Sequence, residues 1–171
     1  MAKSSNLREF QEAILLKLKE ATSQGAAEST SRLGVMVGDK RILVKLSEIV
    51  EVLPVPAFQQ VPFTQPWFLG VANVRGVLYN LTDLAQLMRV SAPAKSANQR
   101  ILLLNSHHTT QSALVVSGLL GLRNLDDMQV KIAEQDVLYT ALTFVDASLN
   151  EWVELDLDAL VQDEVFIQPT I

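Results

Sequence analysis

The sequence of 171 residues contains no cysteine. Disulfide bonds, thiolate metal ligands and cysteine nucleophiles are therefore excluded. Histidine is almost absent as well, since the only two, His107 and His108, are neighbours. Adjacent residues of an extended chain point to opposite sides, and no carboxylate nearby completes a ligand set. We interpret the pair as part of a solvated turn and expect neither a metal nor a cofactor.

The motifs of common catalytic and nucleotide sites are also missing. The seven glycines form neither G-x-x-x-x-G-K-[ST] nor G-x-G-x-x-G, and no serine lies in a G-x-S-x-G context. The acidic pairs at 126–127 and 156/158 are explained more simply by helix capping and solvation than by acid–base chemistry. We therefore predict that the protein is not an enzyme. A small-barrel enzyme or ligand-binding domain remains an alternative, and a purely structural homo-oligomer is a third.

Positive charge is scarce. Lysine and arginine number 14 against 19 acidic residues, giving a formal net charge of −5, and no basic cluster is present. Nucleic acid and anionic membrane surfaces are therefore unexpected partners. No apolar run approaches the roughly 18–20 residues that cross a bilayer, and the N-terminus does not resemble a signal peptide. We expect a cytoplasmic location without membrane insertion.

Residues 1–25 have the pattern of an amphipathic helix. Asn6 can cap its start, with Glu9 in the capping-box position, and Gly25 suits its end. Charged residues such as Glu12 fall mostly on other faces than the apolar residues. The apolar residues with helical spacing are Leu7, Phe10, Ile14, Leu18 and Ala21. Residues 26–32 are small and polar, and are predicted to form a linker.

From residue 33 the pattern changes to short strands separated by turns. Such spacing favours a sandwich or barrel over a parallel α/β sheet. Apolar residues do not alternate strictly, as expected where small barrels pack together and bury both faces of a strand. We predict an all-β fold with minor helices, whose main domain spans 33–165. The predicted strands are 33–37, 41–46, 47–53, 67–74, 77–81, 100–105, 112–117, 119–122, 139–145 and 151–155. Short helices are expected at 83–88, capped by Thr82, and at 157–161, while 123–136 is expected to be irregular.

Two charged residues stand out within this apolar sequence. Arg75 precedes Gly76 in a predicted tight turn, where a fixed guanidinium can bind a partner's carboxylate with two hydrogen bonds. The alternative is that Arg75 caps a carbonyl of its own fold. Glu51 lies between Val50 and Val52, and is either a binding residue or the solvent-facing member of an edge strand.

Three segments resemble the CheW-like adaptor family. The first is E-I-V-E-V at 48–52, followed by V-P at 61–62. The second is G-V-A-N-V-R-G at 70–76, closed by D-L at 83–84. The third is S-A-L-V-V-S-G-L at 112–119, where Ser117 lies near the family's usual aspartate. The resemblance covers roughly residues 33–162.

The resemblance implies two small intertwined five-stranded SH3-like β-barrel subdomains without catalysis. Such adaptors couple the cytoplasmic tip of a methyl-accepting chemoreceptor to the regulatory domain of a CheA-type histidine kinase. The matching receptor-binding positions are Asn73, Val74 and Arg75, and the matching kinase-binding positions are Ile49, Glu51 and Gly70. Asp83 is expected to shape the turn after its strand.

The predicted N-terminal helix and the amino-acid sequence of residues 66–76 are most similar to the PilI-type branch of this family. That branch implies a role in type IV pili and twitching motility, with a flagellar chemotaxis array as the alternative. It also implies recruitment to membrane-associated receptor arrays. The helix at 1–25 either docks on the barrels or offers a further partner-binding face.

Overall fold

The computed structural model describes residues 12, 30–92, 96–105, 111–132 and 137–171. The predicted histidine turn and the N-terminal helix lie outside these residues, except for Glu12, which is helical. The strands are β1 Ser31–Val37, β2 Lys40–Lys45, β3 Ile49–Pro54, β4 Phe68–Val74, β5 Val77–Asp83, β6 Arg100–Leu104, β7 Ser112–Val116, β8 Gly118–Asn124, β9 Gln129–Lys131, β10 Thr140–Val145 and β11 Glu151–Leu155. The helices are η1 Leu46–Glu48, α2 Leu84–Leu87, η2 Leu125–Asp127, α3 Leu157–Gln162 and α4 Glu164–Ile167.

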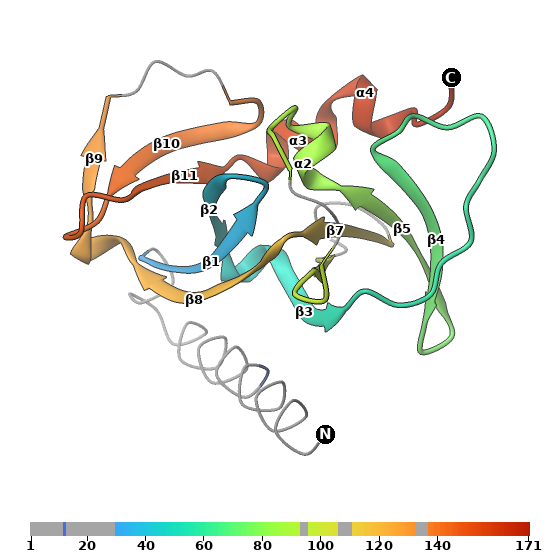
Figure 1. Ribbon diagram of the computed structural model, residues 1–171, viewed down its shortest axis with the longest axis horizontal. Coiled ribbons are helices and arrows are strands. Elements are labelled where there is room, and N and C mark those ends of the chain that lie inside the picture. Colours follow the sequence, from blue (N-terminus) through green and yellow to red (C-terminus); the bar gives the residue numbers. More distant parts are fainter. Residues whose placement is uncertain (1–11, 13–29, 93–95, 106–110, 133–136) are drawn as a thin grey trace.

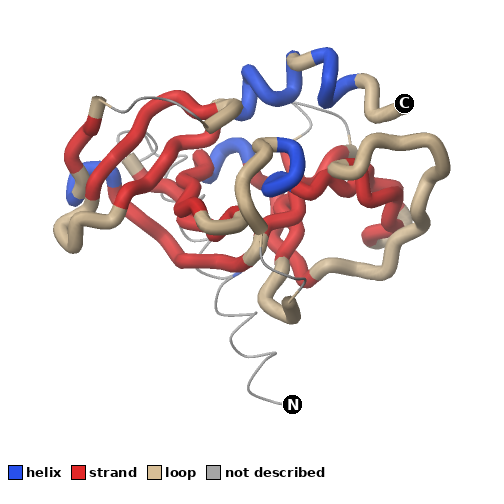
Figure 2. The backbone as a smooth tube through the Cα atoms, turned by 45° about the horizontal axis from the view of Figure 1, so that its top comes forward, coloured by secondary structure: helices blue, strands red, loops and turns tan. Residues whose placement is uncertain are grey.

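The strands form two separate sheets that lie side by side (Figure 1). The first has the order β8-β1-β2-β11-β10-β9 and draws on both ends of the described chain. The second has the order β3-β6-β7-β5-β4 and is built from its middle. Neighbouring strands are antiparallel except for β2–β11 and β5–β7. Figure 2 shows the C-terminal helices α3 and α4 along one side of the two strand groups, while other short helical segments lie among or beside the strands.

Three apolar clusters explain why several strands are hydrophobic without alternation. The largest joins the two sheets and the helices, and includes Ile42, Leu102 and Leu114. A second cluster fills the five-stranded sheet. A third lies in the six-stranded sheet and centres on Leu43, Phe144 and Trp152. Strands such as β2 and β6 send alternate side chains into different clusters, so both of their faces are buried.

The predicted all-β class is confirmed, and most predicted strands are present within a few residues. Three details were wrong. Residues 123–136 are not simply irregular, because β8 continues to Asn124 and β9 follows at Gln129–Lys131. The first sheet consequently has six strands rather than five. The side chain that caps α2 belongs to Asp83 and not to Thr82, since an Asp83 carboxylate oxygen accepts the Gln86 amide at 3.3 Å.

A polar turn anchors the third cluster to the surface. The indole N–H of Trp152 donates to the Asp146 carboxylate at 2.9 Å, and Arg123 stacks over the indole ring at 5.0 Å. Asp146 also accepts the backbone amides of Ser148 and Asn150, each at 2.9 Å. The Trp152 hydrogen bond, followed by those of Asn150 and Ser148, lowers the pKa of Asp146 to about 2.

This lowered pKa predicts a stability change in acid. The carboxylate stabilises the fold fully above its ordinary pKa of 3.8, and this contribution is lost as the pH falls through about 2. The urea midpoint of the wild type should therefore fall more steeply below about pH 4 than that of Asp146→Asn. Asp39→Asn, in the exposed β1–β2 turn, is the control and should retain the steep fall. Parallel curves for the wild type and Asp146→Asn would contradict this account.

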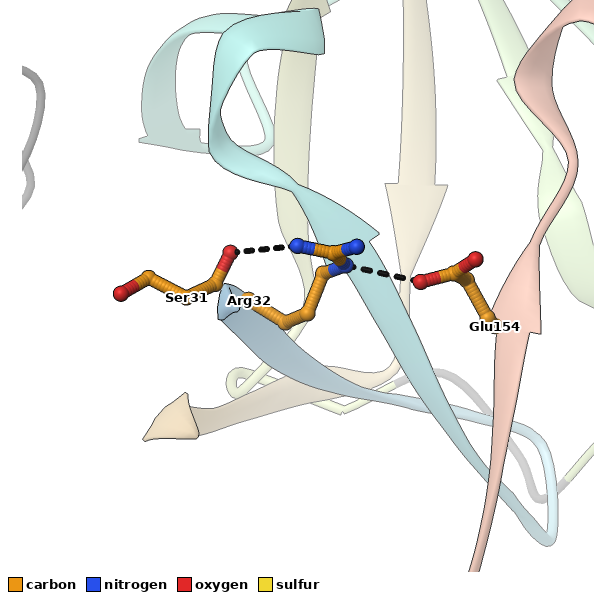
Figure 3. A network of polar contacts seen from close by, with 3 residues as sticks. All are labelled: Ser31, Arg32 and Glu154. Atoms are coloured by element: carbon orange, nitrogen blue, oxygen red, sulfur yellow. Dashed lines mark hydrogen bonds and ion pairs between the residues drawn. The ribbon is translucent and has the colours of Figure 1, made fainter. Parts of the chain in front are cut away.

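A buried ion pair joins strands β1 and β11 of the six-stranded sheet (Figure 3). Arg32 of β1 donates through Nε to Glu154 of β11 at 2.8 Å, and its Nη1 donates to the Ser31 carbonyl at 3.0 Å. Both charged side chains are only 8% exposed. Removing such charges from water is costly, so each depends on the other for its place in the fold.

Candidate functional site

The tip of the β4–β5 hairpin presents Arg75. Val74 pairs with Val77, which leaves Arg75 and Gly76 as a two-residue loop. Both have positive φ angles, 52° and 84°, as a tight hairpin turn with right-handed strand twist requires. The Asn73 side-chain oxygen accepts the Gly76 amide at 2.8 Å. The predicted turn is therefore present, and Asn73 stabilises it from within.

Arg75 and Glu51 form a two-pronged ion pair. Nη1 of Arg75 donates to Oε2 of Glu51 and Nη2 donates to Oε1, both at 2.6 Å. The Arg75 side chain is 68% exposed, whereas that of Glu51 is only 19% exposed. The hydrogen bonds and the charge of Glu51 raise the pKa of Arg75, and the charge of Glu12 adds to this effect.

The pair joins opposite edges of the five-stranded sheet. Glu51 lies on β3, which forms one edge, and Arg75 follows β4, which forms the other. The chain after β3 also reaches β4, because two backbone hydrogen bonds join Gln59 and Val71, at 2.8 and 2.9 Å. Glu51 and Arg75 were assigned by resemblance to separate kinase and receptor surfaces. In the structure, the two side chains are in direct contact.

Gly70 has a structural reason to be glycine. Its φ angle is 145°, and a Cβ atom would lie 2.2 Å from the Gln59 carbonyl oxygen. Any side chain here would displace the segment that closes the barrel. Loss of kinase binding in a Gly70 variant would therefore report on the fold as well as on a contact.

The remaining predicted residues differ in accessibility. Ile49 is fully buried in the largest apolar cluster, and Val74 is half-buried against the second. Asn73 is exposed. Several apolar residues near Glu51 and Arg75 in the chain are exposed and were not singled out from the sequence. They are Val50, 53% exposed, Leu78, 56% exposed, and Val77, 39% exposed.

The strongly shifted titratable groups lie elsewhere. Burial, followed by the hydrogen bond to Asp163, raises the pKa of Tyr139 to about 12. Its hydroxyl donates to the Asp163 carboxylate at 2.7 Å, which lowers the pKa of Asp163. This contact ties the region before β10 to the α3–α4 junction, and Asp163 also caps α4. It is a structural pair rather than part of the Arg75 site.

Within the described parts of the chain, no group of three or more potential ligands could hold a metal ion. None of the helices among these residues is long and apolar enough to span a membrane. The notable surface is the β4–β5 hairpin, which carries the ion-paired Arg75 and the exposed apolar Val77 and Leu78. Such a surface is suited to docking another protein, because a partner can be bound by both charge and apolar contact. The fold and the surface are those of a β-rich domain of two sheets that is suited to binding another protein.

The family model of the CheW-like domain matches residues 32–165, and the chain belongs to this family. It is similar to Protein PilI of Pseudomonas aeruginosa, with 30% identity over 101 residues. That match covers 59% of this chain and 56% of PilI, so it spans little more than half of the relative.

The fold also matches a solved structure, the scaffolding protein TtCheW from Thermoanaerobacter tengcongensis. The TM-score is 0.64 at 12% identity, and the match covers 74% of this chain and 88% of TtCheW. This likeness confirms the CheW-like fold. The protein is therefore a CheW-like domain protein by both its sequence and its fold.

Proposed function

We propose that the protein is a non-catalytic scaffold that couples a chemoreceptor to a CheA-type histidine kinase. Phosphoryl chemistry would belong to the kinase, while this chain would hold the two partners in one assembly. A receptor conformation that changes how the adaptor is bound would then shift the balance of kinase states. The resemblance to PilI supports a chemosensory system that controls type IV pili and twitching motility.

The observation that carries this proposal is the Glu51–Arg75 pair. Glu51 occupies two N–H groups of the guanidinium, which has five, so donors remain for a partner's carboxylate. The pair also fixes the arginine before binding, which reduces the freedom lost when a partner docks. The receptor surface would therefore centre on Arg75 and Asn73.

The kinase surface would lie on the adjoining edge strand β3. Val50 is exposed there, and the side chain of Glu51 is still 19% exposed. Ile49 is buried, so it would support this surface from below rather than touch the kinase. Because Glu51 belongs to both surfaces, binding at one can alter the other by moving a shared side chain. Through this coupling, the binding of one partner would change the affinity for the other.

Glu51→Gln should weaken binding of both partners, by about threefold to tenfold each. The neutral amide keeps the shape of the side chain but removes one charge of the pair, which loosens Arg75 for the receptor and alters β3 for the kinase. Separate calorimetric titrations with a receptor-tip fragment and with the kinase regulatory domain measure the two effects.

Glu151→Gln provides the matched control. Glu151 is also a strand glutamate, and it forms an ion pair with Lys131 on the other sheet. This variant should bind both partners like the wild type. Unchanged binding by Glu51→Gln, or equal losses in both variants, would argue against the shared role of the Glu51–Arg75 pair.

A further inference from the structure

A phenylalanine is presented to solvent in the connection between β3 and β4. Phe63 is 82% exposed, and its φ angle is 61°, in the left-handed region that bulky residues rarely adopt. Two backbone hydrogen bonds with the C-terminal segment hold this conformation. The Ile171 amide donates to the Phe63 carbonyl at 3.0 Å, and the Gln65 amide donates to the Pro169 carbonyl at 2.7 Å. A strained backbone that the surrounding fold holds in place is typical of a functional position.

A cavity opens beside this phenylalanine. Its volume is about 210 Å³, and its wall includes Pro169, which is hydrogen-bonded to the segment that carries Phe63. Three aromatic side chains, Trp67, Phe68 and Phe166, also line it. An apolar cavity of about 150 Å³ in another protein is sufficient to bind benzene, so this cavity is large enough for a phenyl ring.

The segments that form this face lack charged side chains. Residues 52–74 and 165–171 contain no aspartate, glutamate, lysine, arginine or histidine, although 19% of the whole chain is charged. Further apolar side chains are exposed there, since Ile167 is 58% and Ile171 is 84% exposed. Two copies of a chain with a net charge of −5 repel each other, and they approach most easily through faces without charge.

The phenylalanine and the cavity lie on one charge-free face of the same chain, which suits contact with a second copy. In a dimer with two-fold symmetry, the same surface of both copies forms the interface, so every contact occurs twice. Phe63 of each copy can then enter the cavity of the other. The cavity lies at the start of β4, whereas Arg75 follows the end of this strand, roughly 20 Å away. Such a dimer leaves Arg75 accessible.

We propose that the protein forms a two-fold symmetric dimer in which Phe63 of each copy fills the aromatic cavity of the other. The dimer goes beyond the proposed coupling of receptor and kinase and does not depend on it, because no other protein takes part. It presents two Arg75 surfaces. Two linked binding sites hold clustered partners more tightly than one site does.

Sedimentation velocity of the full chain over a range of concentrations tests the dimer. The wild type should change from monomer to dimer as its concentration rises, and Phe63→Ala should raise the dimer dissociation constant at least about tenfold. Leu149→Ala is the matched control and should dimerise like the wild type. Leu149 is 83% exposed with a φ angle of 64°, but it lies between β10 and β11 of the other sheet.

Three results would overturn the dimer. They are a wild type that stays monomeric up to about 1 mM, a Phe63→Ala variant that dimerises like the wild type, and equal losses in Phe63→Ala and Leu149→Ala.

Asn80→Trp tests the cavity side of the contact. Asn80 is exposed on β5 and lines the cavity, so a tryptophan there obstructs its mouth. This variant should also dimerise at least about tenfold more weakly, with the circular dichroism spectrum of the wild type. An equimolar mixture of Asn80→Trp and Phe63→Ala should dimerise more than either variant alone, because one copy keeps its phenylalanine and the other keeps its cavity. A mixture as monomeric as its components would overturn the pairing of Phe63 with the cavity.

Discussion

Replacing Arg75 by glutamate is expected to weaken binding of a receptor-tip fragment at least tenfold, an order of magnitude typical of reversing a charge within a complementary surface. The substitution removes the donors offered to a partner's carboxylate. It also places a second negative charge opposite Glu51, so the remaining surface repels acidic partners. Calorimetric titration or surface plasmon resonance measures the loss.

The fold should survive this change, because Arg75 is exposed at a hairpin tip and contributes to none of the apolar clusters. Its circular dichroism spectrum should match that of the wild type. Lys45→Glu is the matched control, since it reverses an exposed charge on β2 of the other sheet and should bind normally. Normal receptor binding by a folded Arg75→Glu variant would refute the role of the hairpin.

Replacing Glu154 by leucine should destabilise the protein by about 3–5 kcal/mol, because the Arg32 charge then stays buried without its carboxylate. For a chain of this size, such a loss lowers the melting temperature by roughly 10 °C. Urea unfolding at neutral pH, followed by tryptophan fluorescence, measures it directly. Trp152 lies in the same sheet, and it contributes to the signal together with Trp67.

The double variant Arg32→Met/Glu154→Leu separates two explanations. If the penalty comes from an unpaired buried charge, removing both charges should restore stability to about the wild-type level or above it. If it comes from lost packing or a disturbed β11, the double variant should be at least as unstable as the single one. The second outcome would contradict our account of this ion pair.

The short apolar runs and the turn signals of the sequence were sufficient to predict most of the strands. They could not predict that β2 and β11, or β5 and β7, pair in parallel, because these strands are far apart in the chain. Strand β9 was missed for a different reason. All three of its residues are exposed, so it has no buried face to produce a hydrophobic pattern.

The same limit applies to the candidate site. The sequence indicated both Arg75 and Glu51, since each interrupts an apolar stretch, and the Arg-Gly pair predicted the hairpin turn. It gave no sign that the two would meet, because their contact depends on bringing opposite edges of one sheet together. The sequence likewise did not show that Ile49 is buried while its neighbour Val50 is exposed.

We propose above all that this chain physically connects a receptor and a kinase. Size-exclusion chromatography of a receptor-tip fragment and a kinase regulatory domain, with and without the full chain, tests it most directly. We predict that all three elute together when the chain is present, and that the kinase domain separates from the receptor fragment when the chain is absent or carries Arg75→Glu. Elution of the chain with neither partner, or with only one under conditions where both are folded, would contradict the account.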